Sequence, residues 1–175
     1  MSANLLCSLF LMCGPVAPVS GGLPTWAETS TYAIPLVARW EGLSVTAYLD
    51  TIAEPDVWTI CYGETADVRP GEVRTVAECE EGLRRLLRDP YWTQYRADLT
   101  ITALSPQTDA AFTSLSWNIG QTGLRRSTAL RRLNAGDVAA ACEALTWWNR
   151  AGGRVILGLQ NRRADEYRLC MEGAT

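Results

Sequence analysis

The chain has 175 residues, of which 47% are hydrophobic, so it can bury a core and is predicted to form one compact unit. It contains no histidine, and all 16 of its basic residues are arginine. These absences exclude a Ser-His-Asp or Cys-His catalytic site, a phosphate-binding loop that needs lysine, and a histidine-rich zinc site. Acid–base chemistry is therefore left to carboxylates, tyrosine or cysteine.

The charge is unevenly distributed along the chain. Residues 1–100 hold 7 arginines against 13 acids, a net −6, whereas residues 101–175 hold 9 arginines against 6 acids, a net +3. The basic second half suits an anionic polymer, although a solvated surface without a preferred partner would look the same. The isoelectric point near 5.0 lacks the basic footprint of a nucleic-acid binder, so no nucleic-acid partner is expected.

The first segment, residues 1–27, carries no charged side chain. Its apolar run, within "NLLCSLFLMCGPVAPVSGG", is about ten residues long, shorter than the roughly 20 of a transmembrane helix. It resembles the apolar region of a signal peptide, although no lysine or arginine precedes it. We expect an export or weak-anchor segment. A misassigned start, or an N-terminal arm packed on the core, are the alternatives.

A helix followed by a short antiparallel ribbon comes next. In "STYAIPLVARWEG" the apolar spacing predicts a helix that ends at Glu41, just before Gly42. The runs "SVTAYLD" and "VWTICYG" alternate or are rich in β-branched and aromatic residues, which favours two paired strands. The stretch between them, "TIAEPD", contains a proline and is typical of a turn.

The rest of the chain has helical patterns. Thr75 and Glu78 form a capping-box signal for a helix that runs through Arg88 and ends at Asp89-Pro90. Further helices are predicted for "PQTDAAFTSLSWNIG" with a stop at its last glycine, for "STALRRLNAG", for "DVAAACEALTWW" and, after an "AGG" break, near "LGLQNRRADEYRLCM". This order predicts an α+β fold in which a β-containing lobe of about 43–75 precedes a helical lobe of about 76–172, with a cleft between them.

Six cysteines in a chain that is expected to be exported indicate disulfides. Two lie in the leader, Cys7 and Cys13, and no CxxC pair of a zinc site exists. Pairing the others by neighbourhood gives Cys61–Cys79 and Cys142–Cys170. Four cysteines allow three pairings, and buried free thiols are a further alternative.

Several blocks together carry a family resemblance. The blocks "ARWEGLSVTAYLD", "VWTICYGET", "TVAECEEGL", "FTSLSWNIG", "STALRRLNAGD" and "AGGRVILGLQNRRADEYRLC" occur in an order that resembles phage lysozymes of glycoside hydrolase family 24. The likeness is strongest to the branch of signal-anchor-release endolysins and covers residues 33–172. It implies a two-lobed lysozyme-like fold with a small β-ribbon lobe, a helical lobe and a cleft.

The resemblance also implies three catalytic residues, Glu41, Asp50 and Thr59. Two departures from the family pattern accompany them. The threonine follows the aspartate by nine positions where six is usual, which indicates a three-residue insertion within "TIAEPD". The family's Tyr-Gly-His-Thr reads "YGET" here, with Glu64 in the place of the histidine. Asp56 is the rival for the role of Asp50.

The resemblance assigns each of these residues a role in glycoside hydrolysis. Glu41 would protonate the leaving oxygen, because a helix C-terminus and apolar neighbours such as Trp40 favour the protonated carboxyl. Asp50, in a wetter setting, would stay ionised, and Thr59 would position the attacking water. An inverting course implies a gap of about 6.5–9.5 Å between the two carboxylates.

Two further residues are expected to bind substrate, and two tryptophans are possible sugar platforms. Asn118 lines the cleft or merely caps its helix, and Arg154 bridges to the Glu41 carboxylate or is an ordinary exposed arginine. Most of the seven tryptophans are expected in the core. Trp147 and Trp148 are the exceptions to test.

The predicted function is a muramidase that hydrolyses the β-1,4 bond between N-acetylmuramic acid and N-acetylglucosamine in bacterial peptidoglycan and lyses the host. A catalytically weak peptidoglycan-binding module and a structural or inhibitory protein are the alternatives. We expect no metal and no cofactor, a monomer, and export to the host periplasm, with residues 3–19 as a transient tether in the inner membrane. A leader cysteine could also exchange disulfides with Cys61.

Overall fold

The computed structural model describes residues 21–51 and 54–174. The predicted tether, residues 3–19, and both leader cysteines lie outside this part of the chain. Within it, no helix has both the length and the hydropathy that a membrane span requires. The elements follow one another as α1 (Trp26–Glu41), β1 (Ser44–Asp50), β2 (Val57–Cys61), α2 (Val76–Leu86), the π-helical segment η1 (Leu87–Trp92), α3 (Thr93–Ala97), α4 (Pro106–Arg126), α5 (Thr128–Asn134), α6 (Val138–Leu145), β3 (Arg150–Ala151), β4 (Arg154–Val155) and α7 (Leu157–Glu172).

Helix α1 ends where the sequence predicts, at Glu41, and Gly42 follows with a φ of 71°. Its start lies at Trp26, because the side chain of Thr25 accepts the backbone N–H of Glu28 and the Glu28 carboxylate in turn accepts the backbone N–H of Thr25. The sequence interpretation placed this start nearer residue 30. The N-terminally capped helix therefore places the Glu41 side chain at its C-terminal end.

Strands β1 and β2 form the predicted antiparallel ribbon. Tyr48 pairs with Thr59 and Asp50 pairs with Val57, while the register shifts between Ser44 and Tyr48. Side chains two positions apart on a strand point to the same face of a sheet. Asp50 and Thr59 therefore lie diagonally across one face of the ribbon.

One predicted helix end is confirmed and another is wrong. The Thr75–Glu78 capping box opens α2 as predicted, and the helical geometry breaks at Asp89, where the sequence predicted the end, with φ −134° and ψ 117°. The chain then turns directly into the short α3, which the sequence pattern did not indicate. Gly120 does not end α4: its φ of 74° kinks the helix, which then resumes to Arg126. This extra turn buries Leu124 completely in the core.

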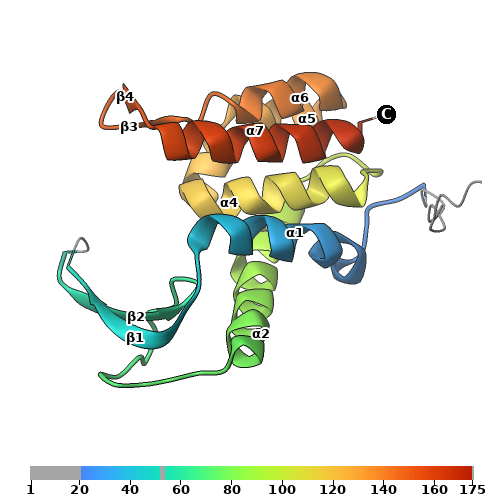
Figure 1. Ribbon diagram of the computed structural model, residues 1–175. Helices are drawn as coiled ribbons and strands as arrows, with labels where there is room; N and C mark the ends of the chain where they lie inside the picture. The colour runs from blue at the N-terminus through green and yellow to red at the C-terminus, as the bar shows by residue number, and fades with distance from the viewer. Residues whose placement is uncertain (1–20, 52–53, 175) are drawn as a thin grey trace, which may run out of the picture.

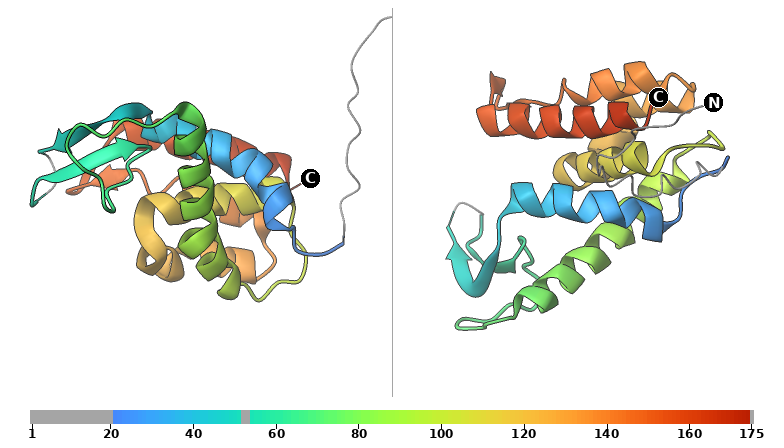
Figure 2. Two further views of the ribbon diagram at one scale, coloured as in Figure 1. Left: turned by 90° about the horizontal axis from the view of Figure 1, so that it is seen from below. Right: turned by 45° about the vertical axis from the view of Figure 1, so that its right-hand side comes forward.

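The "AGG" break contains a hairpin that was not predicted. Ala151 of β3 pairs with Arg154 of β4, and the connecting Gly152 and Gly153 have φ values of 55° and 77°. Two consecutive residues with positive φ are what a tight two-residue hairpin turn requires, and glycine adopts them without steric cost. In every view this hairpin lies at the same end of the molecule as the β1–β2 ribbon (Figures 1 and 2).

The helices are layered, with α4 between α1 and α7 (Figure 1). A larger hydrophobic cluster is centred on α4 to α7, and a smaller one joins α1, β2 and α2. Each contains one disulfide, Cys142–Cys170 in the larger and Cys61–Cys79 in the smaller, so both pairings by neighbourhood are confirmed. The α+β architecture is as expected, and the lobe boundaries at 43–75 and 76–172 stay predictions.

Candidate active site

The end of α1 and the β1–β2 ribbon enclose a pocket of about 420 Å³, which we call the acidic pocket. Glu41, Asp50 and Thr59 all line it, so the structure brings the three predicted catalytic residues together. Asp56 is not among the described residues that line the pocket. The other lining residues are Gly42, Leu43, Ser44, Tyr48, Cys61, Gly63 and Thr65.

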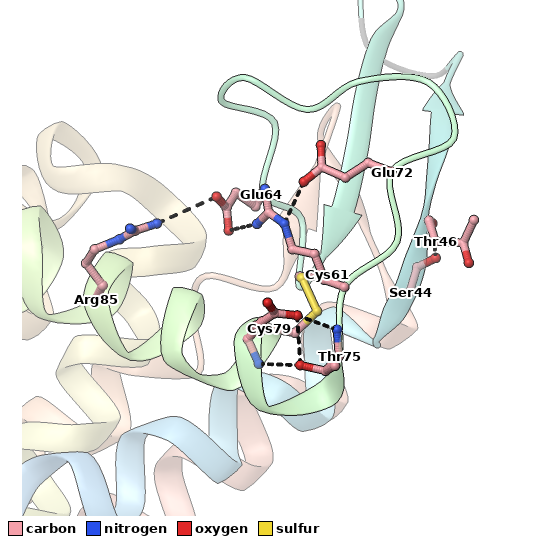
Figure 3. Close-up of a disulfide and its surroundings, with 10 residues drawn as sticks. Ser44, Thr46, Cys61, Glu64, Glu72, Thr75, Cys79 and Arg85 are labelled. Carbon is pink, nitrogen blue, oxygen red and sulfur yellow. Dashed lines mark hydrogen bonds and ion pairs between the residues drawn. A yellow bond between two sulfur atoms is a disulfide. The ribbon is translucent and has the colours of Figure 1, made fainter.

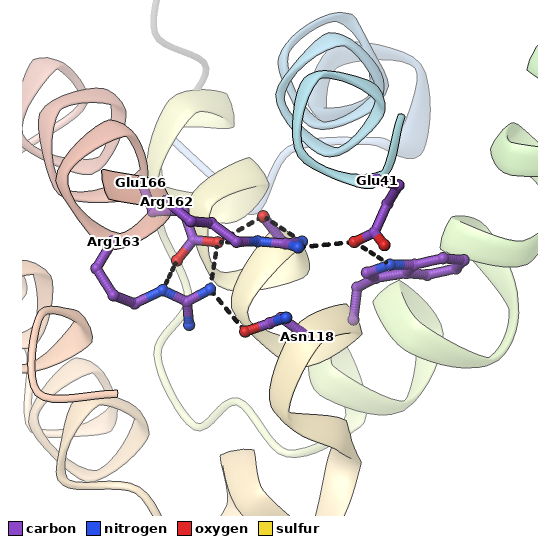
Figure 4. A network of polar contacts seen from close by, with 7 residues as sticks. Glu41, Asn118, Arg162, Arg163 and Glu166 are labelled. Carbon is purple, nitrogen blue, oxygen red and sulfur yellow. Dashed lines mark hydrogen bonds and ion pairs between the residues drawn. The ribbon is translucent and has the colours of Figure 1, made fainter. Parts of the chain in front are cut away.

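The Glu41 carboxylate is held through one of its two oxygens. Oε1 accepts a hydrogen bond from Trp117 Nε1 at 2.8 Å and another from Arg162 Nη1 at 2.7 Å. Neither contact uses Oε2 (Figure 4). The side chain is 24% exposed, so one oxygen is anchored inside the protein while the other can meet a ligand in the pocket.

Arg162 links the acidic pocket to a buried ion network. Its Nε lies 3.2 Å from Glu166 Oε1, and Glu166 also contacts Arg163 and accepts a hydrogen bond from Ser114 at 2.6 Å. Burial raises the pKa of Glu166 and lowers that of the Arg163 guanidinium, because both groups lose the hydration of their charged forms. The network alternates in sign from Glu41 through Arg162 and Glu166 to Arg163, and its formal charges cancel (Figure 4).

The second carboxylate and the threonine lie on the ribbon side of the pocket. Asp50 is half-buried at the end of β1. Thr59 is only 3% exposed, and its hydroxyl donates to the carbonyl oxygen of Val57 at 3.4 Å. A hydroxyl that donates its proton to the backbone keeps its lone pairs for accepting a hydrogen bond from water.

The family model of phage lysozymes matches residues 38–166 of the chain. The SAR-endolysin of Enterobacteria phage P21 is 36% identical over 140 residues, which are 76% of this chain and 78% of that relative. The chain belongs to the phage lysozyme family. It is accordingly an enzyme, a glycosidase of the lysozyme type.

Solved structures support this membership. An L86M mutant of P22 lysozyme has a TM-score of 0.71 and 29% identity, over 79% of this chain and 94% of that one. An endolysin from Escherichia coli O157:H7 phage FAHEc1 gives a TM-score of 0.71 and 27% identity, over 81% of this chain and 91% of that one.

Glu64, at the position where the resemblance predicts a histidine, is not among the described residues that line the acidic pocket. Its carboxylate lies 3.0 Å from Arg74 Nη1 and 3.6 Å from Arg85 Nη2, beside the Cys61–Cys79 disulfide (Figure 3). Arg74 donates hydrogen bonds to the carboxylates of Glu64 and Glu72, and these bonds raise the pKa of its guanidinium above the ordinary value. The substituted position therefore fastens the loop after β2 to helix α2.

The two predicted substrate-binding residues lie away from Glu41. Asn118 is exposed on α4 and accepts a hydrogen bond from Arg163 Nη2 at 3.0 Å. Arg154 is exposed in β4, and the arginine that contacts Glu41 is Arg162 instead. The bridging role considered for Arg154 thus belongs to Arg162, while substrate binding by Asn118 and Arg154 stays a prediction.

Sequence reasoning missed both residues that hold Glu41. Trp117 stands in the family block "FTSLSWNIG", where its neighbour Asn118 drew attention instead. Arg162 is 121 positions from Glu41, and in the sequence nothing separates it from the adjacent Arg163. Only the packing of α1, α4 and α7 selects these two side chains.

Proposed function

We propose that this phage lysozyme hydrolyses the β-1,4 bond between N-acetylmuramic acid and N-acetylglucosamine in bacterial peptidoglycan, with lysis of the host cell as its consequence. The observation that supports this most is the meeting of Glu41, Asp50 and Thr59 in one pocket. They come from a helix end and two strands. Two carboxylates at one cleft are what the hydrolysis of a glycosidic bond requires, and a hydroxyl beside them can position the attacking water.

In this proposal Glu41 is the general acid. Oε2 carries the proton to the leaving oxygen, because Oε1 is occupied by Trp117 and Arg162. Arg162, which also contacts Glu166, stabilises the carboxylate that remains after proton transfer.

Asp50 and Thr59 serve the water that attacks the sugar. The Asp50 carboxylate accepts a proton from the water and stabilises the positive charge that develops at the anomeric carbon. The Thr59 hydroxyl accepts the second hydrogen of the water and thereby fixes its direction. The proposed reaction inverts the configuration at the anomeric carbon.

We further propose that the enzyme acts as a monomer in the host periplasm, after a tethered stage in the inner membrane through residues 3–19. The uncharged, apolar leader supports this, and so does the similarity to a SAR-endolysin. Its polymer partner is peptidoglycan, and Asn118 and Arg154 are proposed to bind it on the helical side.

Release of reducing sugar from purified peptidoglycan by the full chain tests the catalytic assignment. Removing a general acid costs about 10²–10⁴-fold in rate, so Glu41→Gln should lose nearly all activity while its circular dichroism spectrum is unchanged. Asp50→Asn should lose a comparable factor. Asp56→Asn is the matched control: it makes the same chemical change on the neighbouring loop and should stay within about twofold of the parent.

Each result is decisive for one residue or for the whole proposal. Full activity of Glu41→Gln would refute the role of Glu41. A tolerated Asp50→Asn with an inactive Asp56→Asn would transfer the second carboxylate to Asp56. A folded parent that sediments with peptidoglycan but releases no sugar would identify a wall-binding module instead of a hydrolase.

A further inference from the structure

A second pocket, of about 500 Å³, lies between the end of α6, strand β3 and helix α7. We call it the basic pocket, since two arginines, Arg150 and Arg163, line it and none of its described lining residues is acidic. Of the two tryptophans singled out in the sequence, Trp147 lines this pocket and is 53% exposed, whereas Trp148 packs against the core. Arg150 begins the β3–β4 hairpin, which extends from the helices beyond the pocket (Figure 1).

The hairpin and the first residues of α7 are exposed over their whole length. We call residues 150–158 the hairpin tip, since each of them is exposed. Three consecutive members are aliphatic: Val155 is 48% exposed, Ile156 41% and Leu157 70%. Single exposed apolar side chains are ordinary on a protein surface, whereas a contiguous group of them indicates a binding surface.

The three aliphatic side chains do not share one face. Strand β4 ends at Val155, and Ile156 after it has extended backbone, with φ −108° and ψ 120°. Because successive side chains of an extended chain point to opposite sides, Val155 and Ile156 point apart. A rigid partner would cover only one of these sides. A fluid lipid interface surrounds a projecting segment and can cover all three side chains.

The hairpin tip is also basic. It contains Arg150 and Arg154, and no acidic residue occurs between Glu143 and Asp165. Arg150 donates to the carbonyl oxygen of Gly153 at 3.1 Å, and within the described residues neither arginine has an ion-pair partner. Both guanidinium charges are therefore available to an anionic surface, which attracts arginines that lie close to it.

The β1–β2 ribbon, at the same end of the molecule, is the contrasting case (Figures 1 and 2). It also exposes apolar side chains, since Tyr48 is 46% and Leu49 42% exposed. However, Asp50, Glu54 and Asp56 lie in or next to the connection of its strands. An anionic surface repels these carboxylates. Charge complementarity therefore selects the hairpin tip and not the ribbon as the segment that meets such a surface.

We propose that the hairpin tip inserts into the headgroup region of an anionic phospholipid bilayer, with its three aliphatic side chains toward the acyl chains and both arginines paired with lipid phosphates. Exposed aliphatic side chains beside arginines are the combination that binds membrane interfaces. The inference rests on the proposed stage at the inner membrane, which brings the enzyme next to a bilayer, and not on hydrolysis. Arg154, proposed above to bind peptidoglycan, would bind one of these two ligands at a time.

Partitioning of the full chain into vesicles tests the role of the charges. One set of vesicles contains phosphatidylglycerol and phosphatidylcholine, and the other phosphatidylcholine alone. Residues 1–27 have no charged side chain, so the ratio of the two partition coefficients reports the arginines and not the leader. The parent should prefer the anionic vesicles. In Arg150→Gln/Arg154→Gln the ratio should fall about 25-fold, since each arginine near an anionic surface contributes about fivefold.

Arg126→Gln/Arg131→Gln is the matched control. Both arginines are exposed, at the end of α4 and on α5, and their replacement removes the same charge from the chain. The ratio should stay within about twofold of the parent value. A parent without a preference for anionic vesicles, or a control that loses as much as the hairpin variant, would overturn the proposal.

Insertion is tested by tryptophan fluorescence in vesicles whose acyl chains carry bromine, which quenches indoles in contact with them. The emission that Leu157→Trp adds to the parent should be quenched. Val73→Trp is the control, because Val73 is 68% exposed and lies outside the hairpin tip, so its added emission should persist. Unquenched emission from Leu157→Trp, or equal quenching at both positions, would overturn insertion of the tip. If the parent releases no sugar from peptidoglycan, the proposed function fails, while the vesicle measurements still decide whether the hairpin tip binds lipid.

Discussion

The acidic and the basic pocket differ in what their charged residues are free to do. In the acidic pocket, Glu41 has one oxygen anchored by Trp117 and Arg162 and the other available to a ligand. In the basic pocket, Arg163 contacts Glu166 and Asn118 through Nε and Nη2, and its Nη1 has no hydrogen-bond partner among the described residues. Each pocket is thus lined by one end residue of the ion network, and the charged residues between the two ends are paired with each other. The difference teaches that the buried network orients groups at its ends as well as stabilising the fold.

Glu166 lies in the middle of this network, so its removal should break both ends at once. Glu166→Gln leaves Arg162 and Arg163 adjacent and buried without their shared carboxylate, and removal of one partner from a buried ion pair costs about 3–5 kcal/mol. Urea unfolding should show this loss, whereas Glu81→Gln, at an exposed carboxylate beside Arg84, should cost less than about 1 kcal/mol. Equal free energies of unfolding for the two variants would contradict a stabilising role of the network.

The two disulfides allow each pocket to be loosened separately. Cys61 lines the acidic pocket, and Cys142–Cys170 ties α6 to α7, the helices that border the basic pocket. With loops of 18 and 28 residues, each double Cys→Ser variant should lose about 3 kcal/mol in urea unfolding. Residual hydrolysis should fall more in Cys61→Ser/Cys79→Ser. A larger activity loss from the other pair would reverse the assignment of the two pockets.

Substitution of Arg162 sharpens the comparison at the acidic end. Arg162→Lys keeps the charge but cannot reach Glu41 and Glu166 at once, and we expect kcat to fall about tenfold. Arg162→Gln should lower kcat further, since no guanidinium then stabilises the Glu41 carboxylate that remains after proton transfer. A kcat of Arg162→Lys equal to that of the parent would show that Arg162 only supports the fold.

The smallest expected effect concerns a charge outside both pockets. The backbone N–H and hydroxyl of Thr75 donate to the Glu78 carboxylate and lower its pKa below the ordinary 4.5. The stabilisation by this cap is therefore complete above pH 4.5 and disappears as the pH falls through the lowered folded-state value. At pH 7, Glu78→Gln should unfold at a slightly lower temperature than the parent, and this difference should disappear as the pH becomes acidic. A difference that grows on acidification would contradict a lowered pKa of Glu78.

Features that depend on neighbouring residues were predictable from the sequence. The end of α1 at Glu41, the two strands and the Thr75–Glu78 cap follow from local periodicity and capping chemistry. The β3–β4 hairpin was missed because its strands have only two residues each, too short for an alternating pattern. The turn of α4 after Gly120 was missed because its stabilisation comes from burial of Leu124, a tertiary effect.

The candidate site divides in the same way. The resemblance of the sequence blocks predicted Glu41, Asp50 and Thr59 as catalytic residues, and the structure places all three in one pocket. The residues that orient Glu41 come from α4 and α7, which lie far along the chain, and no local pattern distinguishes them. The unused donor of Arg163 is likewise visible only once its three neighbouring contacts are known.

The central claim is that water attacks the bond next to N-acetylmuramic acid in the acidic pocket. Digestion of purified peptidoglycan by the full chain in H₂¹⁸O, followed by mass spectrometry of the fragments, tests it most directly. We predict N-acetylmuramic acid reducing ends that carry one ¹⁸O atom, and none from Glu41→Gln. Reducing ends on N-acetylglucosamine, 1,6-anhydro products without ¹⁸O, or labelled fragments from Glu41→Gln would contradict it.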